Sequence, residues 1–382
     1  MSYPKIYIKK GRERSLNRFH PWVFSGSIHK LEREIDEGEV VQLQDITAKQ
    51  LGVGHYCGGS ISVKMLAFEL IDINEVWYLN KLQEAKKLRT DLFLPSESTN
   101  AYRLVHGEGD GLPGLIVDIY NGVAVIQTHS KGMELAIPIV VQCLKKIGYS
   151  NIIKKPIGAE LSAVLMGEVA ERIEISENDF KLNVDVVFGQ KTGFFLDQRD
   201  NRLLLSALSQ GKAVLNVFSY TGGFSVAALK GGATQVISVD SATKALEIAE
   251  ENAMLNDCAD KHSILKIDAV KYLENMEEQF DIIVLDPPAF AKHKSARHNA
   301  IQAYRRINES AIRNLKPGGL LMTFSCSQVI DKQLFADIVA SAAINVKRNV
   351  RVLSVLRQPM DHPVSIFHPE GEYLKGLILK ID

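Results

Sequence analysis

The sequence predicts an α/β protein built from three parts, with a doubly wound parallel sheet in the last of them. Short apolar runs broken by glycines fill residues 1–70, as in a small β-rich domain. From about residue 188 onward, strand and helix patterns alternate regularly. A length of 382 residues suits two or three domains. We therefore predict a β-rich domain at 1–70, a central α+β domain at 71–187 and a doubly wound α/β domain at 188–382.

The composition is that of an ordinary globular protein. Charged residues make up 24% of the chain, hydrophobic residues make up 46%, and the formal net charge is zero. The overall charge therefore argues neither for nor against a nucleic-acid partner. Residues 1–30 and 290–316 each carry seven lysines and arginines against a single acid. Such clusters can neutralise phosphates, although a run of charges also suits a solvated surface.

The four cysteines, Cys57, Cys143, Cys258 and Cys326, are scattered without C-x-x-C pairing. We therefore expect neither a zinc site nor a disulfide framework, and this usage suits a reducing cytosol. No apolar run approaches the length of a membrane span, and the polar N-terminus lacks an apolar signal core. The sequence predicts a cytoplasmic protein with no metal and no membrane partner.

The N-terminal part is predicted to contain short strands joined by loops. The strand candidates are 5–9, 40–43 and 61–66. The segment 18–26 places aromatic and basic residues together, as RNA-binding surfaces do. Trp22 and Phe24 in this segment fit such a surface and also fit a packed core, and we favour the core interpretation.

The central part combines helix and hairpin patterns. Helices are predicted at about 75–93 and 132–147. Between them, Asn121-Gly122 separates the β-rich runs 115–120 and 123–128, which indicates a two-residue hairpin turn. The preceding glycine-rich loop carries an acidic and histidine-containing cluster. Its members, His106, Glu108 and Asp110, suit a metal or acid–base site, but loop shaping is the interpretation that we favour.

The C-terminal part alternates strands with helices. The predicted strands are 213–218, 235–240, 262–267, 280–285 and 319–325, followed by a last pair near 350–356 and 373–381. The helices between them include 243–256 and 299–315, and Pro317-Gly318-Gly319 is a stop signal for the second of these.

The stretch 213–240 indicates a nucleoside ligand. A buried strand leads into a turn containing Gly222-Gly223, a short helix follows, and the next strand ends on Asp240. The glycines let the backbone approach a ligand, and a carboxylate in this place can accept hydrogen bonds from both ribose hydroxyls. The G-x-G-x-x-G cradle that a pyrophosphate needs is absent, which disfavours a dehydrogenase. S-adenosylmethionine has a ribose but no phosphate, and it fits better.

Polar residues follow several predicted strands in succession. In an open α/β sheet, ligands lie at the carboxyl ends of the strands. These ends are Ser219–Gly223, Asp240, Asp268, Asp286-Pro287-Pro288-Ala289-Phe290 and Ser325-Cys326-Ser327. Three consecutive strands end in an acid, which favours a polar ligand laid across the edge of the sheet.

This set of motifs resembles the class I S-adenosylmethionine-dependent methyltransferases. More closely, the chain resembles the bacterial and archaeal 23S rRNA cytosine-C5 methyltransferases of the RlmI type. The motifs that carry this resemblance are 190–202, 216–223, 286–290, 325–327, 361–364 and 373–376, and the likeness covers essentially the whole chain. It implies an N-terminal PUA-like RNA-binding domain, a central α+β domain and a C-terminal Rossmann-like methyltransferase domain.

The resemblance also assigns a cofactor site. Lys191–Arg199 would cover the methionine end of S-adenosylmethionine, although an interdomain hinge is the alternative for this segment. Asp240 would hold the ribose, and Asp268 would face the adenine amino group. The full set of implied cofactor residues is Lys191, Thr192, Gly193, Phe194, Phe195, Asp197, Arg199, Phe218, Ser219, Tyr220, Gly222, Asp240, Ser241, Asp268, Asp286 and Pro287.

RNA is the implied partner, most specifically large-subunit rRNA, and a homodimer is an assembly that the sequence leaves open. The candidate RNA-binding residues come from the two basic clusters and the aromatic segment. They are Arg12, Arg14, Arg18, His20, Trp22, Lys292, Lys294 and Arg297.

Cys326 and Asp286 are the candidate catalytic residues. Pyrimidine C5 is a poor nucleophile, but a thiolate that adds to C6 turns C5 into an enamine-like carbon able to attack a sulfonium methyl group. Asp286 would hydrogen-bond to the base at N3 and stabilise the charge that develops on the ring. The alternative for Cys326 is a small core residue. The group that removes the C5 proton stays open among Asp286, Lys292 and a bound water.

The motif at Asp286 separates classes of methyltransferase. Enzymes that methylate exocyclic amines typically place an aromatic residue fourth in this motif, where the present chain has Ala289, and Phe290 follows it. This departure disfavours N-methylation. No second cysteine follows the motif closely, so a thiol mechanism would rest on Cys326 alone.

The sequence therefore predicts a methyltransferase that forms 5-methylcytidine in large-subunit rRNA, with the target base turned out of its stack. Uridine-C5 methylation uses the same thiolate chemistry and is the nearest alternative. A small-molecule methyltransferase and a non-catalytic RNA-binding protein with a vestigial sheet are further alternatives. A dehydrogenase is the weakest of them, because the phosphate cradle is missing.

Overall fold

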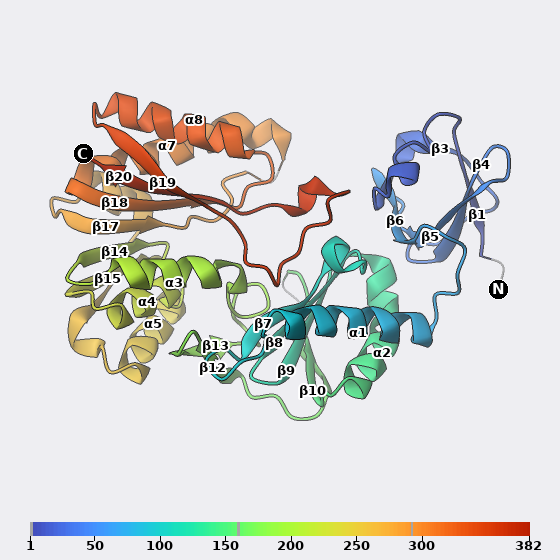
Figure 1. Ribbon diagram of the computed structural model, residues 1–382, viewed down its shortest axis with the longest axis horizontal. Helices are drawn as coiled ribbons and strands as arrows, with labels where there is room; N and C mark the ends of the chain where they lie inside the picture. The colour runs from blue at the N-terminus through green and yellow to red at the C-terminus, as the bar shows by residue number, and fades with distance from the viewer. Residues whose placement is uncertain (1–2, 159–160, 292) are drawn as a thin grey trace. The chain divides into compact units, whose positions relative to one another are not determined.

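A computed structural model of the chain describes residues 3–158, 161–291 and 293–382 (Figure 1). The chain divides into two compact units, each assembled from separate stretches of sequence. The first unit contains Met1–Ile175, Val184–Leu196 and Met360–Gly371, and the second contains Ser176–Asn183, Asp197–Pro359 and Glu372–Asp382. The bounds of the three predicted domains stay predictions, because the division into two compact units does not test them.

A six-stranded sheet at the start of the first unit confirms the predicted β-rich fold. Its strands run in the order β2-β6-β5-β4-β1-β3. They are β1 (Lys5–Ile8), β2 (Trp22–Phe24), β3 (Ile28–Leu31), β4 (Val40–Asp45), β5 (Gln50–Tyr56) and β6 (Ile61–Ala67). Ile6, Ile8 and Val63 are fully buried, so this small sheet has a core of its own.

The core interpretation of Phe24 is wrong. Side chains alternate between the two faces of a strand, and in β2 the buried position belongs to Val23. Phe24 is therefore 47% exposed. Trp22 is half-buried, and its indole N–H donates a hydrogen bond of 2.8 Å to Oε1 of Glu108.

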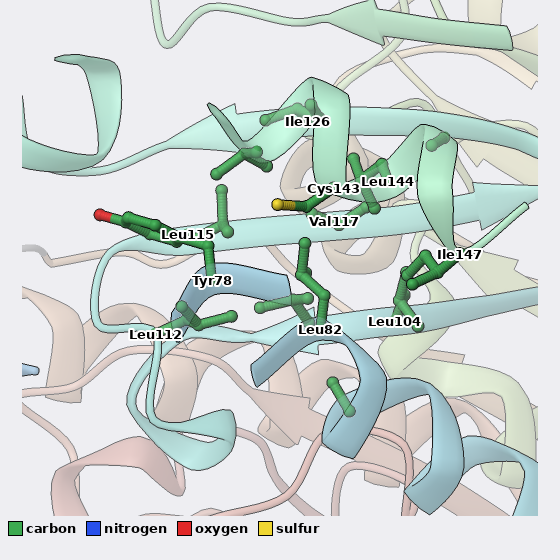
Figure 2. Packing of buried hydrophobic residues seen from close by; sticks show 14 of the residues in the cluster. Tyr78, Leu82, Leu104, Leu112, Leu115, Val117, Ile126, Cys143, Leu144 and Ile147 are labelled. Atoms are coloured by element: carbon green, nitrogen blue, oxygen red, sulfur yellow. The ribbon is translucent and has the colours of Figure 1, made fainter. Parts of the chain in front are cut away.

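The rest of the first unit is an α+β arrangement, as predicted. Its five-stranded sheet runs in the order β11-β10-β9-β8-β7. The elements are α1 (Glu75–Asp91), β7 (Ala101–His106), β8 (Leu115–Tyr120), β9 (Val123–Thr128), α2 (Lys131–Lys146), β10 (Asn151–Lys154) and β11 (Ala163–Met166). An apolar cluster that includes Leu82 of α1, Val117 of β8 and Leu144 of α2 joins the helices to the sheet (Figure 2).

The predicted turn between β8 and β9 is confirmed. The two strands pair in an antiparallel register with Tyr120 opposite Val123. The φ angles of 47° at Asn121 and 82° at Gly122 are the positive values that a two-residue type I′ turn requires.

A seven-stranded sheet forms the centre of the second unit, in the order β16-β15-β14-β17-β18-β20-β19. The strands are β14 (Ala213–Val217), β15 (Gln235–Asp240), β16 (His262–Lys266), β17 (Phe280–Leu285), β18 (Leu315–Ser325), β19 (Val350–Leu356) and β20 (Lys375–Ile381). The first five pair with one another in parallel, which confirms the doubly wound fold. A separate two-stranded sheet pairs β12 (Arg172–Glu177) with β13 (Phe180–Asp185).

Helices cover both faces of the seven-stranded sheet (Figure 1). One face carries α7 (Arg297–Asn314) and α8 (Lys332–Asn345), and α6 (Ala269–Asn275) contributes to the same apolar cluster. The other face carries α3 (Arg199–Leu208), α4 (Gly223–Lys230) and α5 (Thr243–Leu255), whose apolar residues form a second cluster with the sheet. The central strands β14 and β17 are buried on both faces, which explains why they are near-continuous apolar runs.

The end of the sheet departs from a purely parallel arrangement. β20 lies between β18 and β19 and is antiparallel to both. In addition, β18 begins at Leu315, directly after α7, so Pro317-Gly318-Gly319 lies inside the strand and not before it. The pairing of β17 with β18 shifts register between Phe280 and Ile282, which accommodates the proline.

No helix in the described part of the chain is both long enough and apolar enough to cross a bilayer.

The loop-shaping interpretation of the acidic cluster at 106–110 is confirmed. Asp110 accepts a hydrogen bond of 2.8 Å from Nη2 of Arg89 and one of 2.6 Å from the backbone N–H of His106. The Arg89 guanidinium also donates to the carbonyl oxygens of Arg103 at 2.7 Å and Asp361 at 2.8 Å. The side chain of Arg89 is fully buried, so one cation joins α1, β7 and the 360–371 segment.

We expect Arg89→Met to lower the free energy of unfolding of the first unit by about 3–5 kcal/mol, because it leaves the Asp110 carboxylate buried without its cation. Both tryptophans, Trp22 and Trp77, lie in the first unit, so urea denaturation followed by tryptophan fluorescence reports on this unit. Lys87→Met is the matched control on the same helix, since its ion pair with Asp91 is exposed and should contribute less than about 1 kcal/mol. Equal losses for the two variants would contradict the assignment.

Candidate active site

The turn after β14 is built from an unusual backbone. Phe218 and Tyr220 have φ angles of 62° and 48°, and Gly222 has a φ of 77°. A Cβ atom at Gly222 would lie 2.8 Å from Cβ of Ala249 in α5, so a larger residue does not fit there. Positive φ at two non-glycine residues in one turn is a form of strain that clusters at ligand sites.

Two hydroxyl groups in this turn point to a ligand. Ser219 Oγ and Thr221 Oγ1 are buried, and neither has a hydrogen-bond partner within the described residues. The side-chain oxygen of Asn216, near the end of β14, is also buried without a hydrogen-bond partner among the described residues. A buried polar atom without a partner costs about 1–3 kcal/mol, so a polar ligand in this turn would offset a cost that the protein bears alone.

Asp240 lies beside the turn. Its position is set by the parallel register that places Val217 opposite Val239. One carboxylate oxygen accepts the backbone N–H of Tyr220 and the other accepts that of Ala242, both at 2.9 Å. Each oxygen has a further lone pair, so the carboxylate can still accept two hydroxyl groups.

The neighbouring acidic strand end is more exposed. Asp268 is exposed, and its Oδ1 caps α6 through the backbone N–H of Lys271 at 2.9 Å. Ser241, directly after Asp240, is also exposed. The turn, Asp240 and Asp268 therefore follow three adjacent parallel strands, as predicted.

Asp286 continues the same edge on the other side of β14. The register places Val217 opposite Leu285, and the backbone N–H of Asp286 donates to the carbonyl oxygen of Val217 at 3.4 Å. Asp286 is half-buried and Pro287 is buried. The Phe290 ring that follows lies 6.5 Å from the ring of Phe218 and 4.8 Å from that of Tyr304 in α7.

Cys326 directly follows β18, the strand beside β17. Leu285 is opposite Thr323, so Asp286 and Cys326 leave the same edge of the sheet from adjacent strands. Cys326 is half-buried between two fully buried serines, and the Ser327 hydroxyl donates to the carbonyl oxygen of Ala291 at 2.6 Å. Cys326 is therefore placed at the strand edge and is not fully buried.

Tyr304 lies close enough to both candidate catalytic residues for their charges to affect the pKa of its phenol. Burial is the main cause that raises the pKa of the Tyr304 phenol, and the charges of Cys326 and Asp286 raise it further. The phenol thus brings a third titratable group to the pair. In the sequence, only its place on the apolar face of a predicted helix marks it.

Lys375 is a site residue whose role sequence reasoning missed. It lies on β20, directly opposite Ser325, and its side chain is 5% exposed. Its Nζ donates a hydrogen bond of 2.7 Å to the carbonyl oxygen of Ser327. Burial lowers the pKa of Lys375 to about 8, and the charge of Cys326 opposes this shift. The available signal was a lysine within the otherwise apolar run 374–379.

The segment Lys191–Arg199 is divided between the units. Lys191–Leu196 belongs to the first unit, and Asp197 and Arg199 belong to the second. Within the first unit, the Thr192 hydroxyl donates to Oδ2 of Asp118 at 2.6 Å and lies 2.8 Å from the Tyr120 hydroxyl. Tyr120 also accepts the backbone N–H of Phe194 at 3.3 Å.

The other residues of this segment continue from the first unit into the second. Gly193 has a φ of 136°, and Lys191 Nζ lies 4.2 Å from the centre of the Phe195 ring. In the second unit, Asp197 and Arg199 are buried, and Oδ2 of Asp197 accepts a hydrogen bond of 2.6 Å from the Tyr373 hydroxyl.

The candidate RNA-binding residues fall in both units. In the first unit, Arg12, Arg14 and Arg18 are exposed, whereas His20 and Trp22 are half-buried. In the second unit, Lys294 and Arg297 are exposed at the start of α7, and Lys292 lies outside the described residues. Within the parts of the chain that are described, no group of three or more His, Cys, Asp or Glu side chains could hold a metal ion.

Comparison with protein families assigns both ends of the chain. Residues 155–365 match an S-adenosylmethionine-dependent methyltransferase family, and residues 6–68 match a PUA-like domain. A protein named Ribosomal RNA large subunit methyltransferase I from Shigella dysenteriae is 39% identical over 99% of this chain and 98% of its own length. A protein of the same name from Escherichia coli is 40% identical over 99% of each chain.

Solved structures give the same fold. A protein assigned as a sam-dependent methyltransferase from Streptococcus mutans aligns with a TM-score of 0.87 at 25% identity over the whole of both chains. A protein assigned as a methyltransferase and solved in complex with SAH aligns over the same extent with a TM-score of 0.88 at 25% identity. The chain therefore belongs to the S-adenosylmethionine-dependent methyltransferase family that includes the Ribosomal RNA large subunit methyltransferase I proteins.

Proposed function

We propose that this methyltransferase transfers a methyl group to C5 of a cytosine in 23S rRNA, with Cys326 as the nucleophile. The relatives named as large-subunit rRNA methyltransferases support the substrate class. The observation that carries the chemistry is that Cys326 and Asp286 leave adjacent strands at the edge where the Phe218–Gly222 turn lies. A thiol and a carboxylate at one strand edge are the groups that C5 chemistry requires.

The strained turn and Asp240 form the core of the proposed cofactor site. S-adenosylmethionine supplies an electrophilic methyl group when it is bound. Asp240 accepts the ribose hydroxyls, and the buried hydroxyls of Ser219 and Thr221 gain the partners that they lack within the described residues. Phe218, Tyr220, Gly222, Ser241 and Pro287 line the site, and Asp268 faces the adenine amino group.

The segment Lys191–Arg199 belongs to the methionine end of the proposed site. Within it, Thr192 and Phe194 are tied to Tyr120 of the first unit, so they hold the segment in place. Lys191 is exposed and Phe195 is half-buried, which leaves both accessible to a ligand. Gly193 supplies the positive φ that the turn needs, and Asp197 and Arg199 continue the segment into the second unit.

Cys326 and Asp286 have different roles in the reaction at the base. The Cys326 thiolate adds to C6, which places electron density on C5 and on N3. Asp286, in its protonated form, donates a hydrogen bond to N3 and stabilises that charge, and C5 then takes the methyl group. Removal of the C5 proton restores the ring and releases the thiolate.

The PUA-like domain and the exposed arginines Arg12, Arg14 and Arg18 supply RNA contacts, together with His20, Trp22, Lys294 and Arg297. Exposed cations neutralise phosphates without reading sequence, and the half-buried aromatic ring can stack on an unpaired base. A cytoplasmic location belongs to the same proposal, because a reducing compartment suits an enzyme with a thiol nucleophile. The predicted homodimer stays a prediction.

Asp240→Ala should weaken S-adenosylmethionine binding at least tenfold, because both ribose hydroxyls lose a charged acceptor. Isothermal titration calorimetry with the full chain measures this loss. Asp260→Ala removes another exposed carboxylate of the second unit and should leave the affinity unchanged. An unchanged affinity in Asp240→Ala would show that this carboxylate does not bind the ribose.

Cys326→Ala should abolish methyl transfer and leave cofactor affinity by calorimetry unchanged. RNA containing 5-fluorocytidine provides a second readout, since fluorine cannot leave C5 as a cation and the enzyme–RNA bond persists. The wild type should form this covalent complex on a denaturing gel, whereas Cys326→Ala should not. Cys258→Ala, at another half-buried cysteine of the second unit, is the matched control. Turnover by Cys326→Ala would end the nucleophile assignment.

The base is identified by nucleoside mass spectrometry of 23S rRNA from a strain that lacks this protein. We expect the loss of one 5-methylcytidine, restored by the wild type and not by Cys326→Ala. Loss of 5-methyluridine instead would assign the enzyme to uridine. An unchanged nucleoside profile would overturn the rRNA substrate.

A further inference from the structure

Lys375 is held in an unusual environment for a lysine. It lies on β20, an inner strand of the seven-stranded sheet, with its side chain 5% exposed. Its Nζ reaches past Ser325, the residue opposite, to the carbonyl oxygen of Ser327 at 2.7 Å. The Lys375 side chain therefore lies along the segment Ser325–Ser327, whose middle residue is Cys326.

Besides Cys326, the charged groups near Lys375 come from two places. Asp331 and Lys332 lie at the start of α8, and Glu372 precedes β20. Glu372 is paired with Lys332 at 2.6 Å, and Asp331 caps α8 through the backbone N–H of Leu334 at 2.9 Å. Among the groups that raise the pKa of Lys375, Cys326 comes first, ahead of both carboxylates.

We propose that Lys375 activates Cys326 by taking the proton of its thiol and holding the resulting thiolate beside the new ammonium group. This role rests on the proposed function of Cys326 as a nucleophile. The proton moves from Sγ to the neutral Nζ, so the pair keeps its net charge. The sulfur electron pair then forms the bond to C6 of the pyrimidine. The Ser327 carbonyl oxygen accepts one N–H of the ammonium group and leaves its other N–H groups for the sulfur.

The energetics favour this exchange. A buried ammonium group without an anion is costly, and burial lowers the pKa of Lys375 to about 8, near the value of about 8.5 for an ordinary thiol. That value already includes the charge of Cys326, which opposes the shift, so the attraction between the thiolate and the ammonium group is one reason why moving the proton costs little.

The test measures the pKa of the Cys326 thiol without using methyl transfer. The full-length protein is alkylated with iodoacetamide across a pH series, and modification of the Cys326 peptide is followed by mass spectrometry. We expect the wild-type midpoint to lie at least one unit below about 8.5. Lys375→Gln keeps a donor for Ser327 but removes the charge, so its midpoint should rise by at least one unit. This rise corresponds to a roughly tenfold slower reaction near neutral pH.

Lys375→Arg keeps the positive charge, so its midpoint should stay low. Lys380→Met, on the same strand at the far end from the site, should behave as the wild type, and Cys258 in each sample is an internal reference. Circular dichroism and cofactor calorimetry confirm that each variant is folded. Equal midpoints in the wild type and Lys375→Gln would overturn the proposal. A raised midpoint in Lys375→Arg would also overturn it. If Lys375→Gln does not fold, the midpoint of Lys375→Arg decides. If the midpoint shifts as expected while Cys326→Ala still methylates RNA, the ion pair stands and the proposed nucleophile fails.

Discussion

The parallel register of β15, β14, β17 and β18 is the constraint on which the candidate site depends. Val217 lies opposite both Val239 and Leu285, and Leu285 lies opposite Thr323. The strands therefore end at one edge, and the residues that follow them are neighbours although they come from distant parts of the sequence. Hydrogen-bonded strands lie about 4.8 Å apart, which brings the residues at their ends close together. Successive side chains point to opposite faces, so a slip of one residue in this register would turn all the side chains of a strand to the other face. The apolar clusters on both faces of the central strands make such a slip expensive.

Backbone conformation contributes as much to the site as side-chain chemistry does. The positive φ angles at Phe218 and Tyr220 are held in place by Asp240, which accepts the N–H of Tyr220, and by the close contact between Gly222 and α5. The protein thus bears the cost of a strained turn and of two buried hydroxyls before any ligand arrives. A site prepared in this way loses little conformational entropy on binding. It also explains why a family that binds a nucleoside without a phosphate does not need a glycine-rich cradle at this position.

Local patterns were sufficient to predict most of the fold. The run 123–128 is rich in strand-forming residues and directly follows Asn-Gly, so the predicted strand has the observed bounds. The sequence could not place β20 between β18 and β19, because strand order depends on contacts across the whole chain. Phe24 was assigned to the core because an aromatic residue in a strand usually packs, but the pleat gave that place to Val23. Lys375 was missed for a related reason: its importance arises from a cross-strand neighbour, Ser325, fifty residues away in the sequence. The assignment of the cofactor and RNA residues stays a prediction from the family pattern.

The placement of β20 has a consequence for how the polypeptide emerges from the ribosome. Within the described residues, β19 hydrogen-bonds to β20 alone, so it has no partner when it first leaves the exit tunnel. The segment Met360–Gly371 likewise returns to the first unit and supplies the Asp361 carbonyl that Arg89 contacts. Neither unit can complete its native contacts until residues 360–382 have been translated. Nascent chains of this enzyme therefore carry the unpaired edges of β18 and β19 until β20 emerges, an interval in which chaperones can protect them.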